Sequence, residues 1–283
     1  MRYAGLWIIA VVLATGCSAD DSGQAAPGSL PEDALAIVTS TDLGAGPGRV
    51  LVAIASADGR RLGSPDQPIA IEVAPADQPD MRQRADGTFT WIIEGAFGLY
   101  RASFVFDQPG TWQATIVPGN GEPLEPTFFT VRDRSFAPAV GDRAPLVVTP
   151  TISTADLASI TTDPEPDPAF YTTSLDAAVL DGTTVAVFST PAFCRTATCG
   201  PVLDQVKDLA PSFSDVSFVH IEVYTGFDEP DFIPDGTHLS PAVGPDGWNL
   251  PSEPWVFVIQ DGIVTHRFEG VLAPSELTDA LAG

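Results

Sequence analysis

Short hydrophobic runs recur along the first half of the chain and are separated by polar turns. The runs are rich in β-branched and aromatic residues and span 34–39, 49–55, 69–73, 88–93, 99–106, 111–117 and 127–131. Turn-forming sequences such as Ala57-Asp58-Gly59 and Ala85-Asp86-Gly87 lie between them, since Gly and Asp tolerate backbone angles that other residues avoid. The pattern predicts an all-β domain of seven strands over residues 34–132.

The alternating run at 98–106, together with the run at 111–115, resembles the last hairpin of immunoglobulin-like sandwiches. The resemblance implies two packed antiparallel sheets. No cysteine lies in this segment, so we expect aromatic side chains to supply much of the core; they are Trp91, Tyr100, Phe104, Phe106 and Trp112. No catalytic constellation is evident here, which favours a spacer or a binding surface.

The second half alternates between helical and strand patterns. Residues 133–171 are rich in proline and acidic residues and predict a semi-rigid connector, because each residue before a proline disfavours helix. From 172 to 283 we expect a short helix at 174–180, strands at 183–189, 216–223, 255–260 and 263–268, a helix ending near 209 and a final helix from 274. This order predicts an α/β domain.

The start of the chain has the parts of a secretory signal. An apolar run at 6–13 follows Arg2 and leads to Ala14-Thr15-Gly16-Cys17, which resembles the lipobox of bacterial lipoproteins. We expect residues 1–17 to be the signal peptide and lipidation site, with Cys17 lipidated, and residues 18–33 to be a flexible tether. An ordinary secretory signal, with Cys17 discarded or left as a free thiol, is the alternative.

The acidic composition of the chain limits the classes of molecule that the protein could bind. The formal net charge is −24, and Lys207 is the only lysine. This balance argues against a basic surface for nucleic acid. No later apolar run reaches the length of about 20 residues that spans a bilayer. We therefore expect an exported lipoprotein, anchored through its lipid on the outer side of the cytoplasmic membrane or elsewhere in the cell envelope.

The chain has three cysteines. If Cys17 is lipidated, Cys194 and Cys199 remain as a pair in an oxidising compartment, where a disulfide is expected. In one continuous helix their Cα atoms would lie about 8 to 9 Å apart, beyond the limit of about 7 Å for a disulfide. Either Cys194 precedes a helix that starts near Thr198, or the first helical turn unwinds. Pro201 favours the first arrangement, with Thr198 as the cap.

The strand at 185–188, the segment from Pro191 through Cys194 and Cys199 to Pro201, and the later Glu253-Pro254-Trp255 together resemble the thioredoxin-like superfamily. The usual spacing in that family is Cys-x-x-Cys, whereas four residues separate the cysteines here. The resemblance implies a thiol-disulfide oxidoreductase in which Cys194 attacks, Cys199 resolves and Pro254 is a cis-proline of the active site. It implies envelope protein thiols or disulfides as partners and no cofactor.

Three alternatives remain open. A thiol peroxidase would place Thr or Ser three residues before the attacking cysteine, where this chain has Pro191. A Sco-like copper-binding or assembly protein would use Cys194, Cys199 and His238, and thiolates suit copper(I). His220 and His266 lie within expected strands, where we expect packing or surface roles. A non-enzymatic binding or scaffold lipoprotein would keep the disulfide as a structural link.

Overall fold

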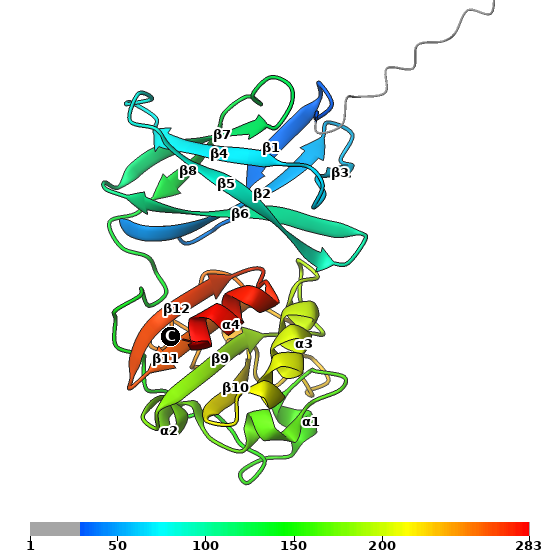
Figure 1. The fold of residues 1–283 in the computed structure, drawn as a ribbon. Helices are drawn as coiled ribbons and strands as arrows, with labels where there is room; N and C mark the ends of the chain where they lie inside the picture. Colours follow the sequence, from blue (N-terminus) through cyan, green and yellow to red (C-terminus); the bar gives the residue numbers. More distant parts are fainter. Residues whose placement is uncertain (1–28, 283) are drawn as a thin grey trace, which may run out of the picture.

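The computed structural model describes residues 29–282, which form two β-sheets, one above the other in Figure 1. The predicted signal peptide, the lipidation site Cys17 and the first part of the predicted tether lie outside these residues. Within residues 29–282, no helix is long and apolar enough to cross a membrane.

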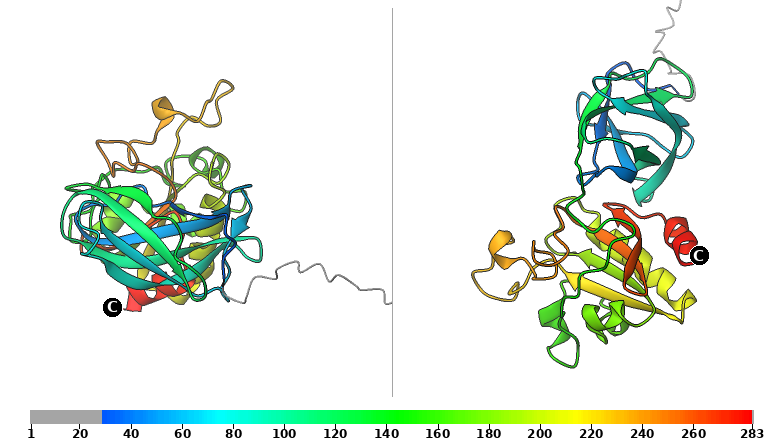
Figure 2. Two further views of the ribbon diagram at one scale, coloured as in Figure 1. Left: turned by 90° about the horizontal axis from the view of Figure 1, so that it is seen from above. Right: turned by 90° about the vertical axis from the view of Figure 1, so that its left-hand side faces the viewer.

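The first sheet has eight strands. They are β1 (Ala34–Val38), β2 (Gly46–Ser56), β3 (Arg61–Leu62), β4 (Ile69–Pro75), β5 (Gln83–Ile93), β6 (Phe97–Phe106), β7 (Gly110–Pro118) and β8 (Thr127–Val131). Their order is β1-β2-β6-β5-β4-β7-β8, with β3 paired to β2. The end strands β1 and β8 contact each other, so the antiparallel sheet is nearly closed and barrel-like, as the view from above in Figure 2 shows.

The prediction of an immunoglobulin-like sandwich is therefore wrong. Strand β5 pairs with β4 through Gln83–Gly87 and with β6 through Thr88–Ile93, so one long strand joins what would otherwise be two sheets. The expected turn at Ala85-Asp86-Gly87 lies inside this strand. A sandwich would need the chain to leave one sheet there, whereas β5 continues.

The interior of the barrel-like sheet is apolar and aromatic. Trp112 packs edge-on against Phe106 with ring centroids 4.9 Å apart, and both side chains are fully buried. Tyr100 is also buried, and its hydroxyl donates to the carbonyl of Gln67 at 3.0 Å. Of the aromatic residues expected in the core, Tyr100, Phe104, Phe106 and Trp112 are buried there, whereas Trp91 is only partly buried.

The second sheet is small and mixed. Its strands are β9 (Thr183–Ser189), β10 (Val216–Glu222), β11 (Trp255–Gln260) and β12 (Ile263–Glu269), in the order β10-β9-β11-β12. Strands β9 and β10 are parallel, and the other neighbours are antiparallel. The helices are α1 (Leu157–Ile160), α2 (Leu175–Val179), α3 (Cys199–Leu209) and α4 (Pro274–Ala282). Short 3-10 turns occur at η1 (Pro168–Tyr171), η2 (Ala210–Ser212) and η3 (Gly236–His238).

The prediction of a thioredoxin-like α/β domain is also wrong, because the described residues 29–282 are mainly β and contain only these four short helices. One face of the mixed sheet is covered by α3 and α4. The five-residue helix α2 and irregular chain around Ala137, Val243 and Trp248 cover the other face. An α/β domain has helices on both faces of its sheet, and this one lacks a full helical layer on the second face.

Three arginines join the two sheets, and one of them, Arg101 of β6, lies 3.3 Å from a Glu276 carboxylate oxygen. Arg49 of β2 makes a bidentate ion pair with Glu276 of α4, with both N–O distances 2.8 Å. Arg267 of β12 donates to the Asp42 carboxylate at 2.9 Å. These pairs are largely buried, and Leu51 of β2 packs beside Val271. Because guanidinium–carboxylate contacts of this kind are directional, they fix how the two sheets face each other.

Candidate functional site

The cysteine pair lies where β9 gives way to α3. Strand β9 ends at Ser189, a loop covers residues 190–198, and α3 begins at Cys199. Cys194 and Cys199 form a disulfide, which confirms the predicted bond, and their Cα atoms are 5.9 Å apart. Cys194 stands in the loop ahead of the helix, the first of the two arrangements that the spacing allowed. Figure 1 shows this loop pointing toward the β5–β6 hairpin.

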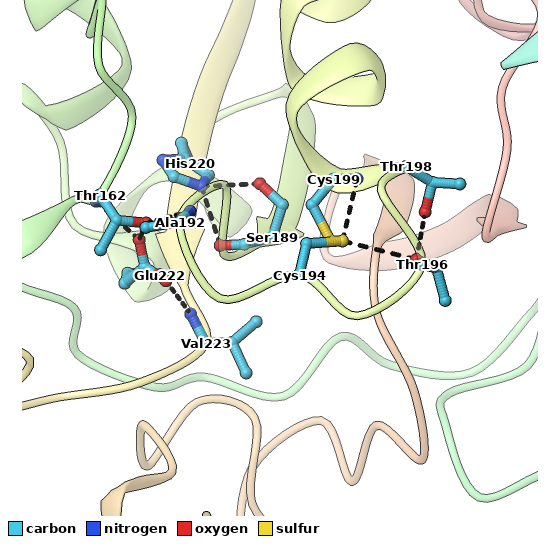
Figure 3. Close-up of a disulfide and its surroundings, with 10 residues drawn as sticks. All are labelled: Thr162, Ser189, Ala192, Cys194, Thr196, Thr198, Cys199, His220, Glu222 and Val223. Atoms are coloured by element: carbon cyan, nitrogen blue, oxygen red, sulfur yellow. Dashed lines mark hydrogen bonds between the residues drawn. A yellow bond between two sulfur atoms is a disulfide. The ribbon is translucent and has the colours of Figure 1, made fainter. Parts of the chain in front are cut away.

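The two sulfurs have different surroundings. Cys199 is fully buried, whereas Cys194 is half-buried and is followed by the exposed residues Arg195, Thr196 and Ala197. The Cys199 backbone N–H donates to Cys194 Sγ at 3.2 Å, and the Thr196 hydroxyl lies 3.4 Å from the same sulfur (Figure 3). Cys194 is therefore the sulfur that a reagent can approach, and it already contacts the first amide of a helix.

The loop between the cysteines is held by its own backbone and hydroxyls. Ala197 adopts a left-handed conformation with φ of 59°, which lets the chain turn back so that α3 can begin. Thr198 occupies the expected cap position, and its carbonyl accepts from the N–H of Val202 at 3.0 Å. Its side chain does not cap the helix; the hydroxyl instead lies 2.7 Å from that of Thr196.

A buried carboxylate anchors the front of the same loop. Glu222, at the end of β10, accepts from both the N–H and the hydroxyl of Thr162 at 2.8 Å. The Thr162 hydroxyl in turn accepts from the N–H of Ala192 at 3.2 Å, two residues before Cys194. Burial raises the pKa of Glu222. Figure 3 shows this chain of bonds leading from β10 toward the disulfide loop.

Pro254 lies at the same edge of the sheet. Trp255 pairs with Phe188, and Ile221 of β10 pairs with the same residue from the other side, so Pro254 comes beside the end of β9. The Glu253–Pro254 peptide bond is cis, as the sequence resemblance implied. Burial and the charge of Glu222 raise the pKa of Glu253 to about 7. A catalytic role for Pro254 stays a prediction.

His220 belongs to a buried polar network behind the loop. Its Nε2 lies 2.9 Å from the Ser189 hydroxyl, and its Nδ1 lies 2.7 Å from the Tyr171 hydroxyl. The Tyr171 hydroxyl donates to Thr161 at 3.0 Å. Burial lowers the pKa of His220 to about 4, so the ring is neutral at neutral pH. His220 holds the end of β9 in place, whereas His266 is exposed on β12.

The third candidate copper ligand, His238, is engaged elsewhere. Its Nδ1 lies 3.2 Å from an Asp235 carboxylate oxygen, and its ring packs on Phe232. Throughout residues 29–282, no group of three or more His, Cys, Asp or Glu side chains is placed to hold a metal ion. The described structure thus brings Cys194 and Cys199 together but does not assemble them with His238 into a metal site.

Sequence reasoning located the cysteine pair but missed Glu222, Thr162 and Glu253. Glu222 ends an apolar strand and Glu253 precedes a proline, positions at which an acidic residue is ordinarily solvated. Both come to the disulfide edge only because β10 and β11 flank β9.

Models of known protein families show no match to this chain, and no curated protein sequence matches it either. The chemistry of the site therefore rests on its own residues.

Proposed function

We propose that the protein exchanges thiols and disulfides with other proteins of the cell envelope through Cys194 and Cys199. The observation that carries this proposal is the contrast between the two sulfurs. Cys194 is accessible and accepts a hydrogen bond from the first amide of α3, whereas Cys199 is fully buried. A disulfide with a purely structural role needs neither an accessible sulfur nor a hydrogen bond to that sulfur from a helix amide.

The exchange can be written with the disulfide as the acceptor of electrons. A partner thiolate attacks Cys194 Sγ, the Cys194–Cys199 bond breaks, and Cys199 leaves with the electron pair and takes up a proton. A second partner thiolate then attacks the partner sulfur of the mixed disulfide and releases Cys194 as a thiolate. The partner loses two electrons and becomes a disulfide, and the cysteine pair becomes a dithiol; the reverse sequence reduces a partner.

The helix start favours the released thiolate. Partial positive charge at a helix N-terminus stabilises an anion there, and a cysteine in that place commonly has a pKa below its ordinary value of about 8.5. Arg195, next in the chain and exposed, adds a positive charge nearby. Cys194 is thus the better nucleophile and the better leaving group of the pair.

The signal-like start of the chain supports a location outside the cytoplasm. Lipidation of Cys17 would attach the protein to a membrane, and an oxidising compartment would maintain the disulfide. The barrel-like sheet then lies between the membrane tether and the reactive edge along the chain.

Trapping experiments test the proposal. In the full-length protein, purified in detergent, Cys199→Ala should accumulate a mixed disulfide with glutathione or an envelope protein, because Cys194 can attack and nothing resolves the product. Cys194→Ala should trap little, since its remaining thiol is buried. Mass spectrometry of non-reduced protein reads the result.

A structural disulfide predicts a different outcome. Both variants would then lose about 2 kcal/mol or more of stability, and neither would capture a partner. Equal trapping by the two variants would also contradict the assignment of roles.

A further inference from the structure

A loop beside the disulfide, residues 224–239, is closed at its base and carries a group of aromatic side chains. Tyr224 pairs with Leu239, and the N–H of Thr225 donates to the carbonyl of His238 at 2.8 Å. Figure 2 shows the segment between β10 and β11, in yellow and orange, projecting away from the mixed sheet. We call residues 224–239 the aromatic loop.

The aromatic loop reaches the reactive cysteine through Phe193. The ring of Phe193, the residue before Cys194, lies 4.9 Å from that of Phe232 and 6.2 Å from that of Tyr224. Phe232 also packs on His238 at 5.1 Å. These rings are only half-buried, and the neighbouring Ile233 is 61% exposed. An open apolar surface thus begins one residue away from Cys194.

The aromatic loop itself is acidic. The aromatic loop carries Asp228, Glu229, Asp231 and Asp235, all exposed, and contains no lysine or arginine. The Asp235 carboxylate accepts a hydrogen bond from the N–H of Thr237 at 2.9 Å and also contacts His238 Nδ1. Asp228, Glu229 and Asp231 therefore present negative charge next to an apolar platform.

We propose that the aromatic loop binds a segment of the partner protein in which an apolar residue lies next to the reactive cysteine and is flanked by lysine or arginine. The apolar residue packs on Phe193, Phe232 and Ile233, and the basic residues face the loop carboxylates. This inference rests on the proposed function and names the partner's chemistry.

Charge complementarity decides between possible occupants. A second copy of this chain also carries a net charge of −24 and would be repelled at an acidic surface, since like charges brought together across an interface oppose binding. A basic, apolar segment gains both burial against the rings and attraction to the carboxylates. Cations also bind favourably over aromatic faces.

The test uses the full-length protein carrying Cys199→Ala, whose Cys194 is free to attack. The probes are three synthetic peptides, each joined to glutathione through one cysteine: the first has a leucine beside the cysteine and flanking lysines, the second has glutamates in place of the lysines, and the third has serine in place of the leucine. Glutathione disulfide serves as the control probe, because it carries neither the leucine nor the lysines of the first peptide. Rate constants for capture are measured at low and high salt.

We expect the lysine peptide to react at least tenfold faster than the glutamate peptide at low ionic strength and several-fold faster than the serine peptide. High salt should shrink the first ratio, because screening acts on exposed charges. In the triple variant Asp228→Asn, Glu229→Gln, Asp231→Asn the lysine-to-glutamate ratio should approach one. The ratio is taken within one variant, so a general change in reactivity cancels.

The matched control removes three exposed carboxylates from the barrel-like sheet: Asp66→Asn, Asp77→Asn and Asp80→Asn. In this control the lysine-to-glutamate ratio of rate constants should equal that of the parent. Phe232→Ala with Ile233→Ser should remove the leucine-over-serine preference. Equal rates for all three peptides, or an equal loss of the ratio in the control, would overturn the inference while leaving the proposed function standing if glutathione disulfide reacts. Failure to react even with glutathione disulfide would overturn both.

Discussion

The two sheets differ in what they bury. The barrel-like sheet encloses aliphatic and aromatic side chains, such as Ile71, Tyr100 and Trp112. The mixed sheet buries apolar residues as well, but at one edge it also buries His220 and Glu222, together with the hydroxyls of Ser189 and Thr190. Candidate chemistry is concentrated in the second region, although both have well-formed cores.

Topology accounts for the difference. Parallel strands β9 and β10 both end at one edge, and α3, which connects them, begins there. Strand ends, a helix N-terminus and the incoming start of β11 therefore converge on the disulfide. In an antiparallel sheet neighbouring strands end at opposite edges, so the barrel-like sheet collects no comparable group of chain ends.

The largest expected effect tests whether the two regions are independent. Phe106→Ala should lower the free energy of unfolding by about 3 to 5 kcal/mol, because it removes a fully buried ring that packs on Trp112. Chemical denaturation measures this loss. The rate at which reduced Cys194 is alkylated should stay within twofold of the parent under native conditions. A large change in that rate would show that the barrel-like sheet shapes the reactive edge.

A second prediction concerns the buried histidine. The pKa of His220 falls from 6.5 to about 4 on folding, so between these values the unfolded chain binds more protons and stability falls as pH falls. At 1.36 kcal/mol per pKa unit the contribution amounts to about 3 kcal/mol. It is fully present above pH 6.5 and is lost on acidification through pH 4.

Removing the titrating ring should flatten this dependence. His220→Gln should be less stable than the parent at pH 7 but should lose less of its remaining stability between pH 7 and pH 4.5. His266→Gln, on the exposed surface of β12, is the matched control and should keep the parent profile. Identical profiles for parent and His220→Gln would refute the assignment.

The smallest expected effect concerns Glu253. Its pKa is raised from 4.5 to about 7, so the folded state binds the extra proton and stability falls as pH rises through this interval. Glu253→Gln should therefore be more stable than the parent at pH 8, by about 1 kcal/mol after allowance for solvent screening, and nearly equal to it at pH 4.5. Thermal unfolding at the two pH values measures this. Glu122→Gln, which removes an exposed carboxylate in the loop between β7 and β8, should show neither effect.

Local sequence patterns predict the individual strands better than the way in which the strands pair to form a sheet. All seven expected runs of the first half form strands, because β-branched and aromatic residues between turns report local preference. The residues Ala85-Asp86-Gly87 in the polar stretch 83–87 predict a turn, yet this stretch is the half of β5 that pairs with β4. None of its side chains is fully buried, so hydrophobic patterning carries little signal there. The expectation of a sandwich rests on the number of strands and on the hairpin at 98–115, and neither reveals that β5 pairs with both β4 and β6.

The candidate site likewise combines features that the sequence predicts with features that depend on tertiary packing. The position of Cys194 ahead of α3 followed from the reach of a disulfide and from Pro201 near the helix start. The bond from Glu222 to Thr162 joins residues 60 positions apart, and such a pairing depends on tertiary packing that no local spacing reveals.

The ion pair between Arg49 and Glu276 has a consequence for synthesis. The two residues are 227 positions apart, so at about 5 to 20 residues per second Arg49 emerges from the ribosome tens of seconds before its partner exists. During that interval the guanidinium is without the carboxylate that it binds in the finished molecule. The last strand of either sheet, β12, ends at Glu269, before Glu276 is reached. The contact between the two sheets through this ion pair therefore closes only after the strands of both sheets have been synthesised.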